Sequence, residues 1–243
     1  MIDVSFLNIA GTSETRKYSC NPPDISVAFL ELKDLNPPSK SLHCVQLPIV
    51  DVLLLVVEDD EILSCYSFLK DTFMSYIKEL GLVYFGVTGD GQSKVKISLL
   101  RCSKGSIHVN AAQNVARTAI KTLKPKAVFS VGCCAGLNRT EAKLGDVVIS
   151  AKLSTFGDKK VIHDQRQWDG RILDVSRQFG SLIKSAADGW KAPLKNPDDG
   201  PNVKVHRDAE ILTGAEVVNS LEECKQLRCR FPQAIAIEQE GQG

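Results

Sequence analysis

The sequence predicts an α/β protein with a mixed, mostly parallel central sheet that helices flank on both faces. Continuous apolar runs, such as residues 52–57 and 127–131, are typical of strands that are buried on both sides. Segments with helical periodicity, such as residues 110–124, separate these runs. Strands that alternate with helices favour a parallel or mixed sheet covered on both faces.

The order of the elements follows from the same patterns. Strands are expected at residues 52–57, 83–87, 95–100, 127–131 and 147–150, at a strand end over 211–214, and at 234–237. A turn at Gly89-Asp90-Gly91 joins the second and third of these strands. Helices are expected at residues 63–80, 110–124, 172–187 and 220–230. Pro125 ends the second helix, because proline lacks the N–H that a helix needs.

The chain is expected to divide near residue 50. Residues 1–50 are interpreted as an N-terminal extension or linker, since Asn36-Pro37-Pro38-Ser39 is typical of a turn or linker. Residues 51–243 are expected to form one domain. The extension is also compatible with a fused regulatory domain in a longer parent protein.

Composition limits the classes of partner. The 243 residues are 43% hydrophobic and 24% charged, with a net charge of +1, so no broad nucleic-acid surface is expected. The longest apolar run, at 52–57, is too short to cross a bilayer, and the start of the chain does not resemble a signal peptide. None of the eight cysteines forms a CxxC pair, which favours reduced thiols and a cytoplasmic location.

Four informative segments follow predicted strands. They are the acidic run at 58–61, the Gly-Cys loop at 132–136, Thr213-Gly214, and the pair Glu238 and Glu240. In open α/β sheets, ligands bind beyond the carboxyl ends of the strands. We therefore expect these four segments to contribute to one site.

The loop Gly132-Cys133-Cys134-Ala135-Gly136 has three interpretations. Glycines at both ends let the backbone approach a ligand closely, or simply allow a tight turn. The pattern Gly-x-Cys-x-Gly also has the shape of a nucleophile elbow, but an elbow needs a helix immediately afterwards. A loop and then a strand follow here, so the cysteine hydrolase is the least favoured interpretation.

Two other patterns do not predict a site. Gly86, Gly89 and Gly91 have the wrong spacing for a dinucleotide-binding loop, and a strand follows them instead of a helix. The four histidines show no metal-ligand spacing, so no metal is expected.

Three stretches together resemble the nucleoside phosphorylase superfamily. Residues 131–150 are similar to its signature loop and following strand, and residues 231–241, which contain Glu238-Gln239-Glu240, are similar to the ribose-binding strand end of bacterial methylthioadenosine/adenosylhomocysteine nucleosidases. Residues 211–219 fall in register with the base-binding loop of the same family. The resemblance covers residues 51–243 and implies a nucleoside phosphorylase-like fold. The sequence as a whole, including Asp188-Gly189-Trp190, also resembles nucleosidase-type effector domains of animal and bacterial immune proteins. The resemblance implies cleavage of adenine nucleotides such as ATP, as in those domains.

The resemblance implies a set of substrate-binding residues. Glu240 aligns with the carboxylate that binds the ribose hydroxyls, although an exposed strand-end charge is the structural alternative. The other implied binding residues are Glu238, Gln239 at the usual methionine position, Val217 and Val218 at the purine, Gly105 and Ser106 at the turn near the ribose, and Gly132 and Cys133 in the signature loop. For the two valines, core packing is an equal alternative.

Glu61 matches the family's acid that positions or deprotonates the attacking water. Breaking an N-glycosidic bond passes through an oxocarbenium-like sugar, which a carboxylate stabilises while it orients water. The same carboxylate repels a phosphate dianion, which favours hydrolysis over phosphorolysis. The structural alternative is a helix N-terminal charge that the macrodipole stabilises. Asp59 and Asp60 lie close enough in sequence to be mistaken for Glu61.

The resemblance also implies an aspartate that protonates the purine, on a strand after Glu240. That position lies past Gly243, so the last strand and helix of the domain are expected to be missing and activity of this chain is in question. The predicted function is hydrolysis of the N-glycosidic bond of a purine, preferably adenine, nucleoside or nucleotide. The alternatives are an inactive nucleotide-binding or interaction module, and a phosphorylase with phosphate as co-substrate. No other cofactor is expected, and the resemblance implies a homo-oligomer.

Overall fold

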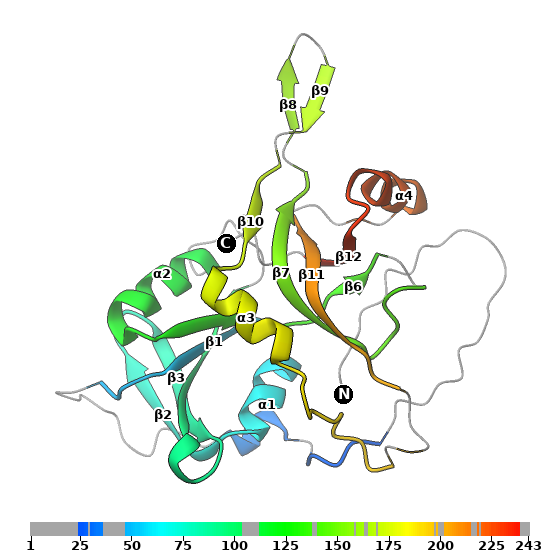
Figure 1. Ribbon diagram of the computed structural model, residues 1–243. Coiled ribbons are helices and arrows are strands. Elements are labelled where there is room, and N and C mark those ends of the chain that lie inside the picture. The colour runs from blue at the N-terminus through cyan, green and yellow to red at the C-terminus, as the bar shows by residue number, and fades with distance from the viewer. Residues whose placement is uncertain are drawn as a thin grey trace. The chain divides into compact units, whose positions relative to one another are not determined.

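The structure, a computed structural model, is described for the following residues: 24–28, 30–35, 47–103, 112–137, 140–157, 159–162, 165–168, 170–196, 198, 202–214, 218 and 220–238. The described residues fall into two compact units. Unit 1 spans residues 27–133, and unit 2 comprises residues 24–26 and 134–238. Figure 1 labels the helices and strands of both units.

Unit 1 is built on a mixed sheet. Its elements are the 3₁₀ turn Leu32–Asp34, β1 (Val52–Val56), α1 (Asp59–Ser67), β2 (Lys70–Ile77), β3 (Gly81–Thr88), the 3₁₀ turn Gly91–Ser93, β4 (Val95–Arg101), α2 (Ala112–Leu123) and β5 (Ala127–Ser130). In the described residues the sheet has five strands in the order β2-β3-β4-β1-β5. Strand β1 pairs in parallel with β4 and β5, whereas β2, β3 and β4 pair antiparallel.

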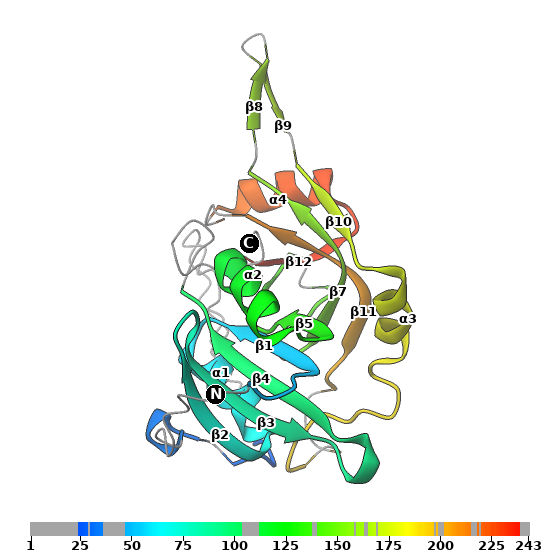
Figure 2. The same cartoon turned by 90° about the vertical axis from the view of Figure 1, so that its left-hand side faces the viewer.

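Helices pack on both faces of the unit 1 sheet. Successive strand residues point to opposite faces, and the neighbours Leu99 and Leu100 of β4 belong to different apolar clusters. Leu99 packs with Ile62 of α1, and Leu100 packs in the cluster that contains Ala119 of α2. Figure 2 shows α2 above the parallel strands, with β2, β3 and β4 side by side. The carboxyl ends of β1 and β4 therefore lie between the two helices.

Unit 2 holds a second mixed sheet. Its elements are β6 (Ala135–Gly136), β7 (Val147–Thr155), β8 (Lys159–Ile162), β9 (Gln165–Trp168), β10 (Ile172–Asp174), α3 (Arg177–Ser185), β11 (Val205–Thr213), α4 (Leu221–Arg230) and β12 (Ala234–Glu238). In the described residues the order is β10-β7-β11-β12-β6, with the central pairs β7–β11 and β11–β12 parallel and the outer pairs antiparallel. Helix α3 lies against β7 and β11, and Leu227 of α4 is buried in the apolar cluster that also holds Leu212 of β11.

The predicted fold class is confirmed, since helices flank mixed sheets whose central strands run parallel. The strands are divided between two sheets instead of one. The predicted strands at 52–57, 83–87, 95–100, 127–131, 147–150, 211–214 and 234–237 all appear within one or a few residues of their expected bounds.

The predicted helix at 63–80 is wrong beyond Ser67. Helix α1 ends there, and Asp71 takes a left-handed backbone conformation (φ 52°) at the start of strand β2. The rings of Phe73 in β2 and Phe85 in β3 then stack at 5.0 Å across the strand pair. The apolar spacing of residues 73–77 fits both the helical period of about 3.6 residues and the strand period of about 2 residues. Cross-strand pairing of aromatic and β-branched residues favours the strand.

In unit 2, two segments differ from the predicted secondary structure. The predicted helix at 172–187 splits into strand β10 and helix α3, which begins after Ser176 because the Ser176 hydroxyl accepts the Phe179 N–H. The polar sequence after residue 155 predicts no element, yet residues 159–162 and 165–168 form the β8–β9 hairpin that projects beyond β7 and β10 (Figure 1).

The motif Leu144-Gly145-Asp146-Val147 joins β7 to β11 through one carboxylate. Asp146 accepts the backbone N–H of Lys143 and of Lys204, both at 2.9 Å, and its Oδ2 lies 3.0 Å from His206 Nε2. Both side chains of the Asp146–His206 pair are under 10% exposed. Burial by itself would raise the pKa of Asp146, but the hydrogen bonds from His206, Lys143 and Lys204 outweigh it and the pKa is lowered.

A lowered pKa at Asp146 predicts acid-sensitive stability. The carboxylate stabilises the fold above its unfolded pKa of about 4, and this contribution is lost as the pH falls through the lower folded value. Asp146→Asn is expected to lower the free energy of unfolding at pH 7 by about 1–3 kcal/mol, because the hydrogen bonds lose their charged acceptor. Urea unfolding at pH 7 and pH 3 tests this. A difference between wild type and variant that stays constant over this range contradicts it.

Candidate active site

Glu61 is fixed inside unit 1 at the carboxyl end of β1. It is the third residue of α1, where it forms a capping box with Glu58, and it is only 8% exposed. Its Oε2 accepts the backbone N–H of Val57 at 2.8 Å and that of Glu58 at 3.0 Å. These bonds hold the carboxylate at one orientation.

The loop after β5 completes the setting of Glu61. Cys133 donates its backbone N–H to Glu61 Oε1 at 3.1 Å. A side chain at position 132 would place its Cβ 2.9 Å from the same oxygen, so only glycine lets the loop come this close. The structure thus brings together three predicted site residues, Glu61, Gly132 and Cys133.

The charge of Glu61 affects a neighbouring thiol. Burial raises the pKa of Cys65 to about 11, and the nearby Glu61 carboxylate adds to the rise. The other acids of the run differ in setting, since Asp60 is exposed and Asp59 pairs with Arg101. Of the acidic residues in the first turn of α1, Glu61 alone is buried. A buried carboxylate with a fixed orientation suits the stabilisation of a cation or the alignment of a water molecule.

Arg101, at the end of β4, was not singled out from the sequence. Its Nε donates to the Val57 carbonyl at 3.0 Å, and its Nη1 lies 2.5 Å from Asp59 Oδ1. Arginine at the end of a strand is common, so its link to the Glu61 segment has no sequence signal. Its parallel pairing partner in β1, Val56, is the residue just before Val57.

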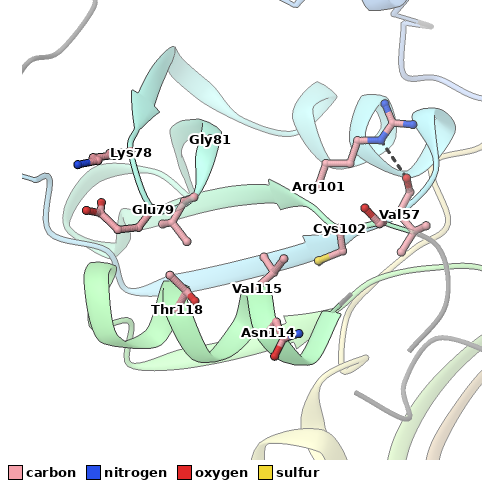
Figure 3. Close-up of a pocket in the computed structure, with 11 residues that line it drawn as sticks. Val57, Lys78, Glu79, Gly81, Arg101, Cys102, Asn114, Val115 and Thr118 are labelled. Carbon is pink, nitrogen blue, oxygen red and sulfur yellow. Dashed lines mark hydrogen bonds between the residues drawn. The ribbon is translucent and has the colours of Figure 1, made fainter. Parts of the chain in front are cut away.

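A cavity of about 780 Å³ lies at the same strand ends, on the α2 face of the sheet. This volume is within the range of small-molecule sites, about 300–1,000 Å³. Figure 3 shows Cys102 directed towards α2, while Arg101 turns to the Val57 carbonyl. The cavity and the Glu61 cluster meet at Val57, which lines the cavity and donates to Glu61.

Unit 2 holds two further predicted residues, Glu238 at the end of β12 and Val218 between β11 and α4. Glu238 pairs with Thr213 across β11 and β12 and is half-buried. Burial raises the pKa of Cys134, and the Glu238 charge raises it further. Val218 is 1% exposed and packs in the apolar cluster with Phe156 and Leu212, as the core-packing alternative expects.

The remaining predicted residues, Gly105, Ser106, Val217, Gln239 and Glu240, lie outside the described residues. Their roles stay predictions, and so does the role of Val218 at the purine. In the described part of the chain, no three His, Cys, Asp or Glu side chains gather as a metal site would need. Among the described helices, none is long and apolar enough to cross a membrane.

Two curated proteins are similar to this chain in sequence. A death domain-containing ATP nucleosidase of Amphimedon queenslandica is 24% identical over 97% of this chain and 46% of its own length. A 5′-methylthioadenosine/S-adenosylhomocysteine nucleosidase of Desulfotalea psychrophila is 27% identical over 60% of this chain and 58% of its own length. The chain thus spans about half the length of these curated relatives. No protein-family model matches it.

Solved structures share the fold. The methylthioadenosine/adenosylhomocysteine nucleosidase of Neisseria meningitidis, in complex with methylthio-immucillin-A, aligns with a TM-score of 0.60 at 20% identity over 79% of this chain and 77% of its own. A futalosine hydrolase mutant of Helicobacter pylori aligns with a TM-score of 0.58 at 17% identity over 79% of this chain and 80% of its own. At this identity the likeness establishes the nucleoside phosphorylase-like fold.

Proposed function

We propose that this chain, which is similar in sequence to two nucleosidases and shares the nucleoside phosphorylase-like fold, hydrolyses the N-glycosidic bond of a purine nucleoside or nucleotide. The base is expected to be adenine. The observation that supports this best is the Glu61 carboxylate, which the backbone N–H groups of Val57, Glu58 and Cys133 fix at the carboxyl end of β1.

The proposed chemistry uses Glu61 in two ways. As the bond between base and ribose breaks, positive charge develops on the sugar, and a nearby carboxylate stabilises it. The same oxygens orient a water molecule for attack on the anomeric carbon and accept its proton, which contributes about 10²–10⁴-fold to the rate. The electron pair of the broken bond leaves with the purine, which takes up a proton.

Hydrolysis is proposed in preference to phosphorolysis. Phosphate at neutral pH carries up to two negative charges, and the fixed anion of Glu61 would repel it from the position of the attacking nucleophile. Water is uncharged, so the Glu61 carboxylate does not repel it.

The binding roles are proposed from the resemblance. Glu240 would accept hydrogen bonds from the ribose hydroxyls, with Glu238 and Gln239 beside it. Val217 and Val218 would hold the purine, and the loop at Gly105 and Ser106 would lie near the ribose. The homo-oligomer, the cytoplasmic location and the division at residue 50 also stay proposals.

The test is base release, followed by chromatography, from adenosine, methylthioadenosine, inosine, AMP and ATP, each with and without phosphate. The chain is assayed beside a version extended by the strand and helix that the resemblance implies. Phosphate-independent release of adenine is the expected result. Release by the extended form alone would keep the proposed reaction and show that it needs the added strand and helix.

Two outcomes overturn the proposal. Release that requires phosphate makes the protein a phosphorylase. If neither form releases base while adenosine or ATP still raises the melting temperature, the inactive binding module is the better function.

Substitution of Cys133 or Cys134 by serine is expected to leave base release largely intact, because the hydrolysis needs no thiol nucleophile. Complete loss of base release would support the cysteine hydrolase.

A further inference from the structure

We propose that Arg101 is a positioning residue for Glu61, an inference that rests on the proposed hydrolysis. Its guanidinium donates to the Val57 carbonyl and pairs with the Asp59 side chain, and the amides of Val57 and Glu58 hold the Glu61 carboxylate. Arg101 therefore acts on the reaction through Val57 and Glu58 and does not touch the substrate.

The contacts form a continuous chain within unit 1. Arg101 Nε donates to the Val57 carbonyl at 3.0 Å, and Nη1 lies 2.5 Å from Asp59 Oδ1. The carbonyl of Val57 belongs to the peptide unit whose N–H is that of Glu58, and that N–H donates to Glu61 Oε2 at 3.0 Å. A rotation of this peptide unit would thus alter the Arg101 and Glu61 contacts together.

Arginine suits this role better than lysine. Its planar guanidinium can donate to a carbonyl from a fixed direction while its charge lies beside a carboxylate, whereas an ammonium is a point charge on a flexible stem. The side chains of Arg101 and Asp59 are 49% and 44% exposed. An ion pair at this exposure contributes little to stability, so the contact matters for geometry more than for folding.

The test compares Arg101→Ala and Arg101→Lys with a matched control, Lys126→Ala. Lys126 pairs with Asp51 at 2.8 Å next to the amino end of β1, so its loss removes a similar ion pair far along the same strand. For Arg101→Ala, kcat for adenosine is expected to fall about 10–100-fold with KM unchanged, as small misplacements of catalytic groups do. Free guanidinium ion is expected to restore part of the kcat of Arg101→Ala. Lys126→Ala is expected to behave as wild type.

Two results overturn the positioning role. If Arg101→Ala raises KM for AMP and ATP but leaves adenosine unaffected, Arg101 binds the phosphates directly. If Arg101→Ala lowers the melting temperature together with kcat, and free guanidinium ion does not restore kcat, the role of Arg101 is only structural.

Hydrogen exchange separates this inference from the proposed function. If the wild-type protein releases no base, the hydrolysis is wrong, but the positioning contact is still measurable. The amides of Val57 and Glu58 are then expected to exchange faster in Arg101→Ala and to be unchanged in Lys126→Ala. Unchanged exchange at these amides in Arg101→Ala would overturn the inference whatever the activity.

Discussion

Glu61→Gln is expected to lower the rate of base release by about 10²–10⁴-fold, the usual contribution of a positioned acid–base group. The glutamine oxygen can still accept the N–H groups of Val57 and Glu58, whereas its NH2 group, in place of Oε1, cannot accept the Cys133 N–H. The variant loses the negative charge that stabilises the sugar cation and the basic oxygen that takes the proton from water. The measurement is kcat for adenine release from adenosine.

Asp60→Asn is the matched control for this substitution. Asp60 immediately precedes Glu61 in the first turn of α1, but its side chain is exposed. Each change removes one charge near the helix N-terminus, which costs about 0.3–1 kcal/mol of stability. Equal losses of activity in the two variants would contradict the assignment of Glu61, because they would reflect the helix and not the carboxylate.

The thiol of Cys65 reports whether the charge is gone. Burial is the main cause of its raised pKa, and the Glu61 charge is the second cause. Glu61→Gln is therefore expected to lower the pKa of Cys65 from about 11 without bringing it to the value of an exposed thiol. The pH dependence of Cys65 alkylation measures this shift, and Asp60→Asn should leave it unchanged.

Many of the strands and helices could be predicted from the sequence because their signals are local. The run at 52–57 and the helix before Pro125 depend on apolar spacing within one segment. The segment at 70–77 could not be assigned in this way, because its apolar residues fit both periods. Its pairing with β3, including the contact of Phe73 with Phe85, decided the outcome.

In the candidate site too, local sequence signals could be read, whereas contacts between distant segments could not. Glu61 and Gly132 were predicted because each follows an apolar run that predicts a strand and matches a segment of the family that the chain resembles, and the structure brings them together. The reason for glycine at 132 could not be predicted, since it depends on a carboxylate far away in the sequence. Arg101 was missed for the same reason, because its role arises only where β4 and β1 pair.

Phe156→Ala is expected to lower the free energy of unfolding by about 3–5 kcal/mol, as the loss of a buried phenylalanine does. Phe156 is 2% exposed and follows β7, where its N–H donates to the Thr213 carbonyl of β11 at 2.9 Å. Its ring packs with Leu212 and Val218 in the core of unit 2. Urea unfolding at neutral pH measures the loss.

Gly214→Ala is expected to lower the free energy of unfolding by about 1–3 kcal/mol for the complementary reason. A Cβ at position 214 would lie 2.7 Å from Cε1 of the Phe156 ring, and a ring buried among other side chains cannot move away. Gly180→Ala is the control. A Cβ at position 180, in helix α3, meets only Val175 at 3.8 Å, so this change is expected to be neutral or to stabilise the helix.

The double variant tests whether the two losses have one cause. In the Phe156→Ala background, the alanine at position 214 enters space that the ring has left, so its cost is expected to fall by at least about 1 kcal/mol. The same cost in both backgrounds would mean that contact with the Phe156 ring is not the cause of the loss at position 214. A coupled result would mean that Phe156 sets how closely the chain after β11, which leads to Val218, can approach the sheet. The proposed purine-binding loop would then depend on this core contact for its position.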